Sequence, residues 1–154
     1  MSPTTAGFVV DASVALKWLI EEEGSEAAMR LRGADLAAPA LMRIEAANVL
    51  RSLVARQEIE ASVAAELLGF LQTAPVAIVE HDDALEQAAL ELAVMLHHPV
   101  YDCVYLALAQ RTKRTLVTAD RRFLRAIRAG GFTTATLALE DLGRGAPPRE
   151  TSRQ

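Results

Sequence analysis

Four acidic residues lie within or directly beside apolar stretches of the sequence. Asp11 follows Phe8–Val10, Glu45 lies within Leu41–Ala47, Asp102 lies within Val100–Val104, and Asp120 follows Leu116–Ala119. A carboxylate near apolar surface is costly unless it is paired or holds a metal ion. We therefore expect folding to gather the four carboxylates into one pocket that binds a divalent cation.

The expected ligand atoms indicate which cation this is. Carboxylate oxygens without a neighbouring cluster of histidine and cysteine favour Mg²⁺ or Mn²⁺ over zinc. Mg²⁺ usually keeps several waters and takes one or two protein carboxylates together with phosphate oxygens of a substrate. Such a site is typical of metal-assisted hydrolysis of a phosphodiester bond.

Each acid also has a simpler interpretation. Asp11 and Asp120 could cap the helices that follow them, and Asp102 could begin its helix. Glu45 is harder to explain in this way, because it lies inside an expected helix, on the same face as Leu41 and Val49. No basic residue shares that face, so the alternative for Glu45 is a side chain that reaches solvent.

The hydrophobic pattern predicts strands that alternate with helices. Such an order predicts an α/β domain with a mainly parallel sheet. The expected strands cover residues 8–10, 36–38, 76–79, 115–118 and 135–139. The expected helices cover residues 13–20, capped by Ser13, then 25–32, 41–56, 61–73, 82 or 83 to 96, 102–111 and 121–129.

Two of the acids follow expected strands directly. Asp11 comes immediately after one strand, and Asp120 comes two residues after another. Ligands of open α/β sheets bind beyond the carboxyl ends of the strands. The order of the elements therefore places Asp11 and Asp120 at the functional edge of the sheet.

The length and composition indicate a single domain. Of the 154 residues, 51% are hydrophobic, which suffices for a core. We expect the domain to cover residues 1–142 and the Pro- and Gly-rich stretch 143–154 to be a disordered tail. The sequence has no secretory leader pattern and no apolar run long enough for a membrane span. Its one cysteine, Cys103, fits a reducing cytoplasm, and we expect this residue in the core.

A basic segment interrupts an otherwise acidic chain. The net charge is −4, which argues mildly against a nucleic-acid partner. Arg121, Arg125 and Arg128 nevertheless fall on one face of the expected helix 121–129. This face could hold the backbone of RNA, although an ordinary solvated helix face explains the pattern equally simply.

Four segments together resemble the PIN-domain ribonucleases, in particular the VapC-type toxins of bacterial type II toxin–antitoxin pairs. These segments are VVDASVALKW from Val9, PALMRIEAAN from Pro39, YDCVYLALA from Tyr101 and LVTADRRF from Leu116. Their order and spacing match the family over about residues 8–142. The combination is specific, whereas any one segment is not.

The resemblance implies a three-layer α/β/α sandwich with a short parallel sheet. It implies an Mg²⁺- or Mn²⁺-dependent endoribonuclease that hydrolyses RNA phosphodiester bonds. By motif, Asp11, Glu45, Asp102 and Asp120 would be the catalytic acids, with Asp11 and Asp102 as metal ligands. Ser13 and Thr118 match supporting hydroxyl positions. The resemblance also implies a homodimer and a cognate antitoxin of the VapB type, and the apolar helices between Leu41 and Phe70 offer surface for such contacts.

Other classes of function remain open at the level of sequence. The first is a PIN-type nuclease for RNA processing without a toxin role, and the second is a non-catalytic protein whose acids only hold a cation. A phosphatase with Asp11 as nucleophile is less favoured, because Ser13 stands where a second aspartate is expected. Metal-free catalysis by two of His81, His97 and His98 is also less favoured, because His97-His98-Pro99 is typical of a helix end.

Overall fold

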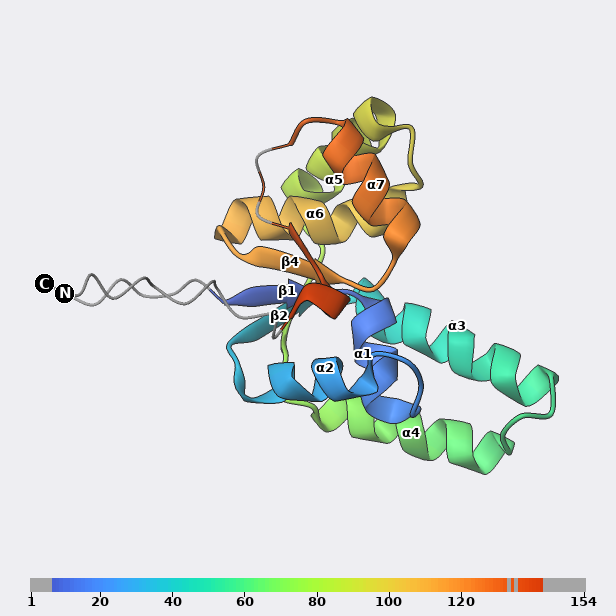
Figure 1. Cartoon of the computed structure of the whole chain (residues 1–154). Coiled ribbons are helices and arrows are strands. Elements are labelled where there is room, and N and C mark those ends of the chain that lie inside the picture. The colour runs from blue at the N-terminus through green and yellow to red at the C-terminus, as the bar shows by residue number, and fades with distance from the viewer. Residues whose placement is uncertain (1–6, 133, 135, 143–154) are drawn as a thin grey trace, which may run out of the picture.

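The chain folds around a five-stranded parallel sheet, described by a computed structural model over residues 7–132, 134 and 136–142. The strand order is β3-β2-β1-β4-β5, so β1 lies in the middle (Figure 1). All four neighbouring pairs are parallel. The strands are β1 (Phe8–Val10), β2 (Leu36–Pro39), β3 (Ala77–Val79), β4 (Thr115–Thr118) and β5 (Thr136–Ala138).

Helices cover both faces of this sheet and make three layers (Figure 1). One layer holds α1 (Ala12–Leu19), α2 (Ser25–Arg30), α3 (Leu41–Ala55) and α4 (Ala61–Thr73). The other holds α5 (Asp83–Leu96), α6 (Val100–Thr112) and α7 (Arg121–Ala129). Short 3₁₀ turns, η1 (Leu31–Gly33) and η2 (Leu139–Asp141), follow α2 and β5. The predicted α/β/α sandwich with a parallel sheet is confirmed.

The core explains why the central strands are continuously apolar. Val9, Val10, Leu116 and Val117 are completely buried, because helices cover both sides of β1 and β4. Helix α6 packs against β1, β2 and β4, and it is buried almost throughout from Cys103 to Ala109. The prediction that Cys103 is a core residue is confirmed, and burial raises the pKa of its thiol to about 11.

Two helix starts differ from the prediction. Helix α1 begins at Ala12 and is capped by Asp11, whose side chain accepts a hydrogen bond from Val14, so the expected cap at Ser13 is wrong. Helix α6 begins at Val100 rather than at Asp102, because Pro99 supplies the extended residue before the helix. Asp102 therefore lies within the first turn of α6.

The remaining predicted boundaries agree to within one or two residues. Helices α4 and α7 and strand β4 have the predicted ends. The expected tail, residues 143–154, lies outside the described residues, as does Ala135 at the start of the last predicted strand. In the described part of the chain no single helix is long and apolar enough to cross a membrane, and α5 with α6 passes that test only as a pair bent by 116°.

Candidate active site

The pairing of β1 with β4 places Asp11 beside Thr118. Val10 is the register partner of Val117, so the next residues, Asp11 and Thr118, stand side by side where the two strands end. The sheet order reverses between β1 and β4, since β2 and β3 extend the sheet on one side and β5 on the other. This is the switch point at which open α/β sheets bind their ligands.

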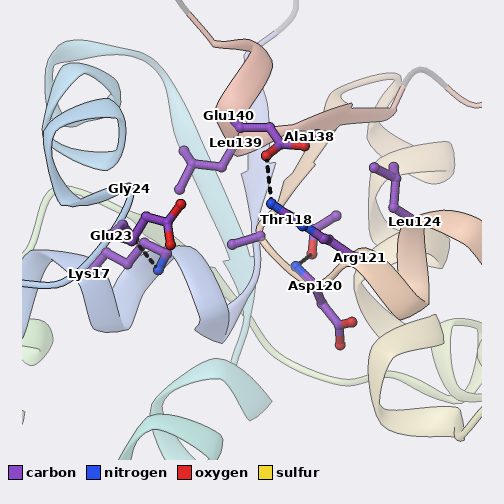
Figure 2. A pocket seen from close by; sticks show the side chains of 11 residues that line it. Lys17, Glu23, Gly24, Thr118, Asp120, Arg121, Leu124, Ala138, Leu139 and Glu140 are labelled. Carbon is purple, nitrogen blue, oxygen red and sulfur yellow. Dashed lines mark hydrogen bonds and ion pairs between the residues drawn. The ribbon is translucent and has the colours of Figure 1, made fainter.

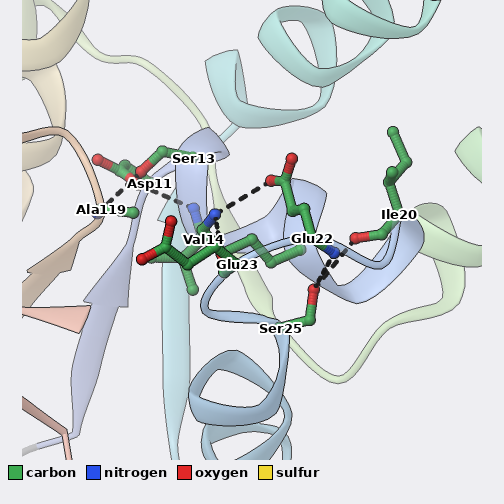
Figure 3. A network of polar contacts seen from close by, with 9 residues as sticks. Asp11, Ser13, Val14, Ile20, Glu22, Glu23, Ser25 and Ala119 are labelled. Atoms are coloured by element: carbon green, nitrogen blue, oxygen red, sulfur yellow. Dashed lines mark hydrogen bonds and ion pairs between the residues drawn. The ribbon is translucent and has the colours of Figure 1, made fainter. Parts of the chain in front are cut away.

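Asp11 is held by three hydrogen-bond donors. Its Oδ1 accepts hydrogen bonds from the Ser13 hydroxyl at 2.5 Å and from the Val14 amide at 3.2 Å. Its Oδ2 accepts one from the Thr118 hydroxyl. The Ser13 hydroxyl in turn accepts a hydrogen bond from the Ala119 amide at 3.0 Å (Figure 3). The expected supporting hydroxyls of Ser13 and Thr118 thus both contact Asp11.

These donors do not compensate for the burial of the Asp11 carboxylate. The residue is only 4% exposed. Burial raises its pKa from 3.8 to about 6, although the bonds from Ser13, Thr118 and Val14 lower it, and the charge of Asp102 raises it further. A carboxyl group with so high a pKa carries a charge that the folded chain leaves partly uncompensated.

Glu45 and Asp102 belong to the same electrostatic cluster. Burial is the main cause that raises the pKa of Glu45, and the charge of Asp102 also raises it. The Glu45 carboxylate accepts a hydrogen bond of 2.6 Å from the Tyr105 hydroxyl. Asp102 lies 2.6 Å from Nε2 of His98, whose ring stacks on Phe123. The charge of Asp102 therefore acts on both Asp11 and Glu45, which links three of the four predicted acids.

Asp120 has a different local role. Its Oδ1 accepts hydrogen bonds from the Arg122 and Phe123 amides, so it caps α7 as the simpler interpretation expected. The residue also lines a cavity of about 300 Å³ beside Thr118, although its carboxylate points away from Lys17 and Leu139 (Figure 2). Lys17 of α1 and Leu139 of η2 lie on the opposite side of this cavity. Among the described residues, the lining of this cavity includes none of Asp11, Glu45 and Asp102, so the link from Asp120 to the cluster runs only through its neighbour Thr118.

Comparison with known proteins assigns the fold. A family model described as the PIN domain matches residues 8–128. The chain belongs to the PIN-domain family. PIN domains are nucleases, and they generally use divalent metal ions. A comparison with curated protein sequences gave no match.

Solved structures of the same fold resemble this PIN domain. PAE2754 from Pyrobaculum aerophilum is 22% identical, with a TM-score of 0.68, over 90% of this chain and 87% of its own. VapC20 of Mycobacterium tuberculosis, described as a toxin that cleaves the sarcin–ricin loop, is 16% identical, with a TM-score of 0.63, over 83% and 98%. A toxin–antitoxin complex from Klebsiella pneumoniae contains a chain that is 11% identical, with a TM-score of 0.61, over 85% and 96%.

The chemistry of the acids fits a hard divalent cation. Asp11, Glu45 and Asp102 offer carboxylate oxygens, and the raised pKa values of Asp11 and Glu45 indicate negative charge that a cation would offset. Among the residues that the structure describes, no three His, Cys, Asp or Glu side chains form a ready metal cage. Mg²⁺ does not need one, because it keeps waters and takes one or two carboxylates.

The arginines of α7 point away from the core. Phe123, Leu124 and Ile127 form the buried side of this helix, whereas Arg121, Arg125 and Arg128 are exposed. Arg121 contacts Glu140 at 3.1 Å beside the cavity (Figure 2). The predicted basic face therefore exists, and its role in RNA binding is still a prediction.

Two residues of the site were missed by the sequence reasoning. Tyr105 lies in an apolar helical segment and is fully buried, but its hydroxyl also binds Glu45. His98 was interpreted as part of a helix end, yet it contacts Asp102. Tyr105 lies three residues after Asp102 on α6, and this spacing is the sequence signal for a shared helix face, whereas His98 precedes Pro99 and lies outside α6.

Proposed function

We propose that this PIN domain is an Mg²⁺- or Mn²⁺-dependent endoribonuclease and the toxin of a toxin–antitoxin pair. The observation that carries the proposal is the buried carboxylate of Asp11 at the switch point, electrostatically coupled to Asp102. Structural neighbours support the biological role, because one is described as an RNA-cleaving toxin and another comes from a toxin–antitoxin complex. The alternatives are a processing nuclease without a toxin role and a non-catalytic cation-binding protein.

In this proposal each acid has a different role. Asp11 and Asp102 would hold the divalent cation, and the Ser13 and Thr118 hydroxyls keep Asp11 oriented. When bound, the cation would supply Lewis acidity for the attacking water and the leaving oxygen. Glu45 is suited to take the proton of the attacking water, because its raised pKa makes it a better base than an ordinary glutamate. Asp120 helps to orient the water from the α7 side.

The reaction is a hydrolysis at phosphorus. The water oxygen forms a bond to phosphorus while the bond from phosphorus to the 3′-oxygen breaks, and the departing oxygen takes up a proton. The 2′-hydroxyl takes no part. The products therefore carry 5′-phosphate and 3′-hydroxyl ends, whereas attack by the 2′-hydroxyl would leave 2′,3′-cyclic phosphates.

Cleavage of an end-labelled pool of structured RNA tests the proposal. Purified protein is incubated with Mg²⁺ or Mn²⁺, with EDTA, and as the Asp11→Asn variant. Asp83→Asn is the matched control, because Asp83 is an exposed aspartate in the first turn of α5. Metal-dependent cuts with 5′-phosphate ends that vanish only in Asp11→Asn would support the proposal. Cuts that survive EDTA, or cyclic phosphate ends, would contradict the mechanism.

We also propose a cognate VapB-type antitoxin that neutralises the nuclease in the cytoplasm. A basic side chain of this partner would be attracted to the carboxylates of Asp11, Glu45 and Asp102 and would compete with the cation. Induction of the wild-type chain alone should arrest growth, and Asp11→Asn should not. A small reading frame beside the gene is the candidate antitoxin, and its co-expression should restore growth. Continued growth arrest would show that this reading frame does not encode the antitoxin.

A homodimer is the remaining part of the proposal. Large apolar side chains are exposed on α3 and α4, where Ile44 is 70% and Phe70 is 60% exposed. Exposed apolar patches of this kind mark interfaces. Sedimentation at micromolar concentration should show a dimer for the wild type and a shift toward monomer for Ile44→Lys with Phe70→Lys. A monomeric wild type would contradict the dimer.

A further inference from the structure

The hydrogen bond from Tyr105 to Glu45 joins the two helix layers of the sandwich. Glu45 comes from α3, on one side of the sheet, and Tyr105 comes from α6, on the other (Figure 1). The two residues are 60 positions apart, and their oxygens lie 2.6 Å from each other. A contact between the layers can fix the distance between α3 and α6, which neither helix determines alone.

Tyr105 is itself fixed on every side. It is completely buried and belongs to the main core. The Ala12 backbone, next to Asp11, lies close enough to this hydroxyl to lower its pKa slightly. Asp102 lies three residues earlier on the same face of α6. The Tyr105 side chain therefore contacts the elements that carry all three coupled acids.

The chemistry of the Tyr105 hydroxyl makes it a constant donor. Burial and the negative charge of Glu45 raise its pKa above the ordinary tyrosine value, so the hydroxyl keeps its proton at neutral pH. A buried phenol of this kind orients a carboxylate and does not exchange protons with substrate. Its position inside the core also keeps it away from RNA.

We propose that Tyr105 is a positioning residue that holds the Glu45 carboxylate at its working distance from Asp11 and Asp102. It acts through Glu45 and does not touch the substrate. The inference rests on the proposed function, because the geometry it sets is that of the cation and the attacking water. Groups that orient the residues of a metal site usually change metal affinity or activity about 10- to 100-fold when removed.

The variant Tyr105→Phe removes the hydroxyl and keeps the ring. Mn²⁺ binding is measured by calorimetry, RNA cleavage by kcat and KM, and folding by thermal unfolding. Tyr101→Phe is the matched control, because Tyr101 lies on the same helix and is 61% exposed. We expect Tyr105→Phe to weaken Mn²⁺ binding and lower kcat about 10- to 100-fold, with KM for RNA unchanged. Tyr101→Phe should match the wild type.

A double-mutant cycle separates positioning from general loosening of the core. In a Glu45→Ala background, Tyr105→Phe should cause no further loss of Mn²⁺ affinity, because its target is gone. An equal loss in both backgrounds would overturn the proposal, as would a Tyr105→Phe variant with wild-type affinity and kcat. If the wild type neither binds Mn²⁺ nor cuts RNA, the proposed function itself is wrong, and this inference fails with it.

Discussion

The Thr118 hydroxyl donates a hydrogen bond to Oδ2 of Asp11, although 107 positions separate the two residues. The parallel pairing of β1 with β4 brings them together, since each comes directly after the register pair Val10 and Val117. The acid at the centre of the proposed site is thus placed by the sheet itself. Its position does not depend on a mobile loop.

The burial of Asp11 predicts a pH-dependent cost to stability in the absence of metal. Its pKa is raised from 3.8 to about 6, so the folded state binds this proton more tightly than the unfolded state does. The stabilisation from the protonated form is fully present below about pH 4 and is lost as the pH rises to about 6. In EDTA, Asp11→Asn should therefore gain stability relative to the wild type over this window, by up to roughly 3 kcal/mol.

Urea unfolding of both proteins between pH 4 and pH 7 measures this difference. Asp82→Asn is a control, because a hydrogen bond from Leu85 and the interaction with Arg111 lower the pKa of Asp82 below 3.8. The stability that its charged form contributes is present above about pH 4 and is lost only at lower pH, so the difference between wild type and Asp82→Asn should stay nearly constant from about pH 5 to pH 7. A difference between wild type and Asp11→Asn that stays constant with pH would contradict the assigned burial of the charge.

The protonation of Asp11 should also appear in the pH dependence of Mn²⁺ affinity. A proton on Asp11 competes with the metal ion, so Mn²⁺ affinity should be steady above about pH 6 and fall by up to about tenfold per pH unit below it. Calorimetric titrations at pH 5, 6, 7 and 8 check the profile. An affinity that is equal at pH 5 and pH 7 would show that Asp11 is not a ligand.

The Thr118 hydroxyl should matter for both stability and cation affinity. Thr118→Val keeps the shape but removes the donor to Asp11 and the acceptor for the Asp120 amide. Leaving these buried groups unpaired should cost about 1–3 kcal/mol in urea unfolding. The pKa of Asp11 should rise further, because the bond from Thr118 lowers it.

Thr115→Val is the control for this variant, since Thr115 is the first residue of the same strand and lies away from the site. It should unfold close to the wild type, and its Mn²⁺ affinity at pH 6 should be unchanged. Equal behaviour of the two valine variants would mean that the Thr118 hydroxyl contributes nothing specific to the site.

The basic face of α7 predicts a salt-dependent contribution to RNA affinity. Arg121→Gln with Arg125→Gln should weaken binding of an uncleavable RNA. The slope of log affinity against log salt should fall by roughly 0.7 for each RNA phosphate that an arginine no longer neutralises. Arg30→Gln with Arg32→Gln is matched in charge, because both residues are exposed and lie in and just after α2. Equal slopes for the two variants would indicate that the α7 arginines are an ordinary solvated surface.

Local patterns predicted most of the fold because strands and helix ends are set by neighbouring residues. The continuous apolar run at Phe8–Val10 and the helix predicted at 121–129 are examples. The same patterns misplaced the cap of α1, because Asp11 and Ser13 are both good caps and only the folded backbone selects Asp11. Asp11 was nevertheless placed at the correct edge of the sheet.

Contacts between distant elements were beyond these patterns. Glu45 had no partner in its own helix, and its partner Tyr105 belongs to a helix packed against another face of the sheet. His98 appeared to be a helix end, while its contact with Asp102 depends on the turn made by Pro99 before α6. The pair of Glu45 and Tyr105 follows from the packing of whole layers, and the pair of His98 and Asp102 follows from the turn before α6. The local pattern of a single sequence specifies neither.

The most direct test of the account measures cation binding and cleavage on the same preparations of wild type, Asp11→Asn, Asp102→Asn and Asp83→Asn. The account predicts that Asp11→Asn and Asp102→Asn each lose tight Mn²⁺ binding and RNA cleavage together while remaining folded, and that Asp83→Asn keeps both. Wild-type Mn²⁺ binding and cleavage in Asp11→Asn or Asp102→Asn would contradict the claim that these acids form one metal-dependent nuclease site.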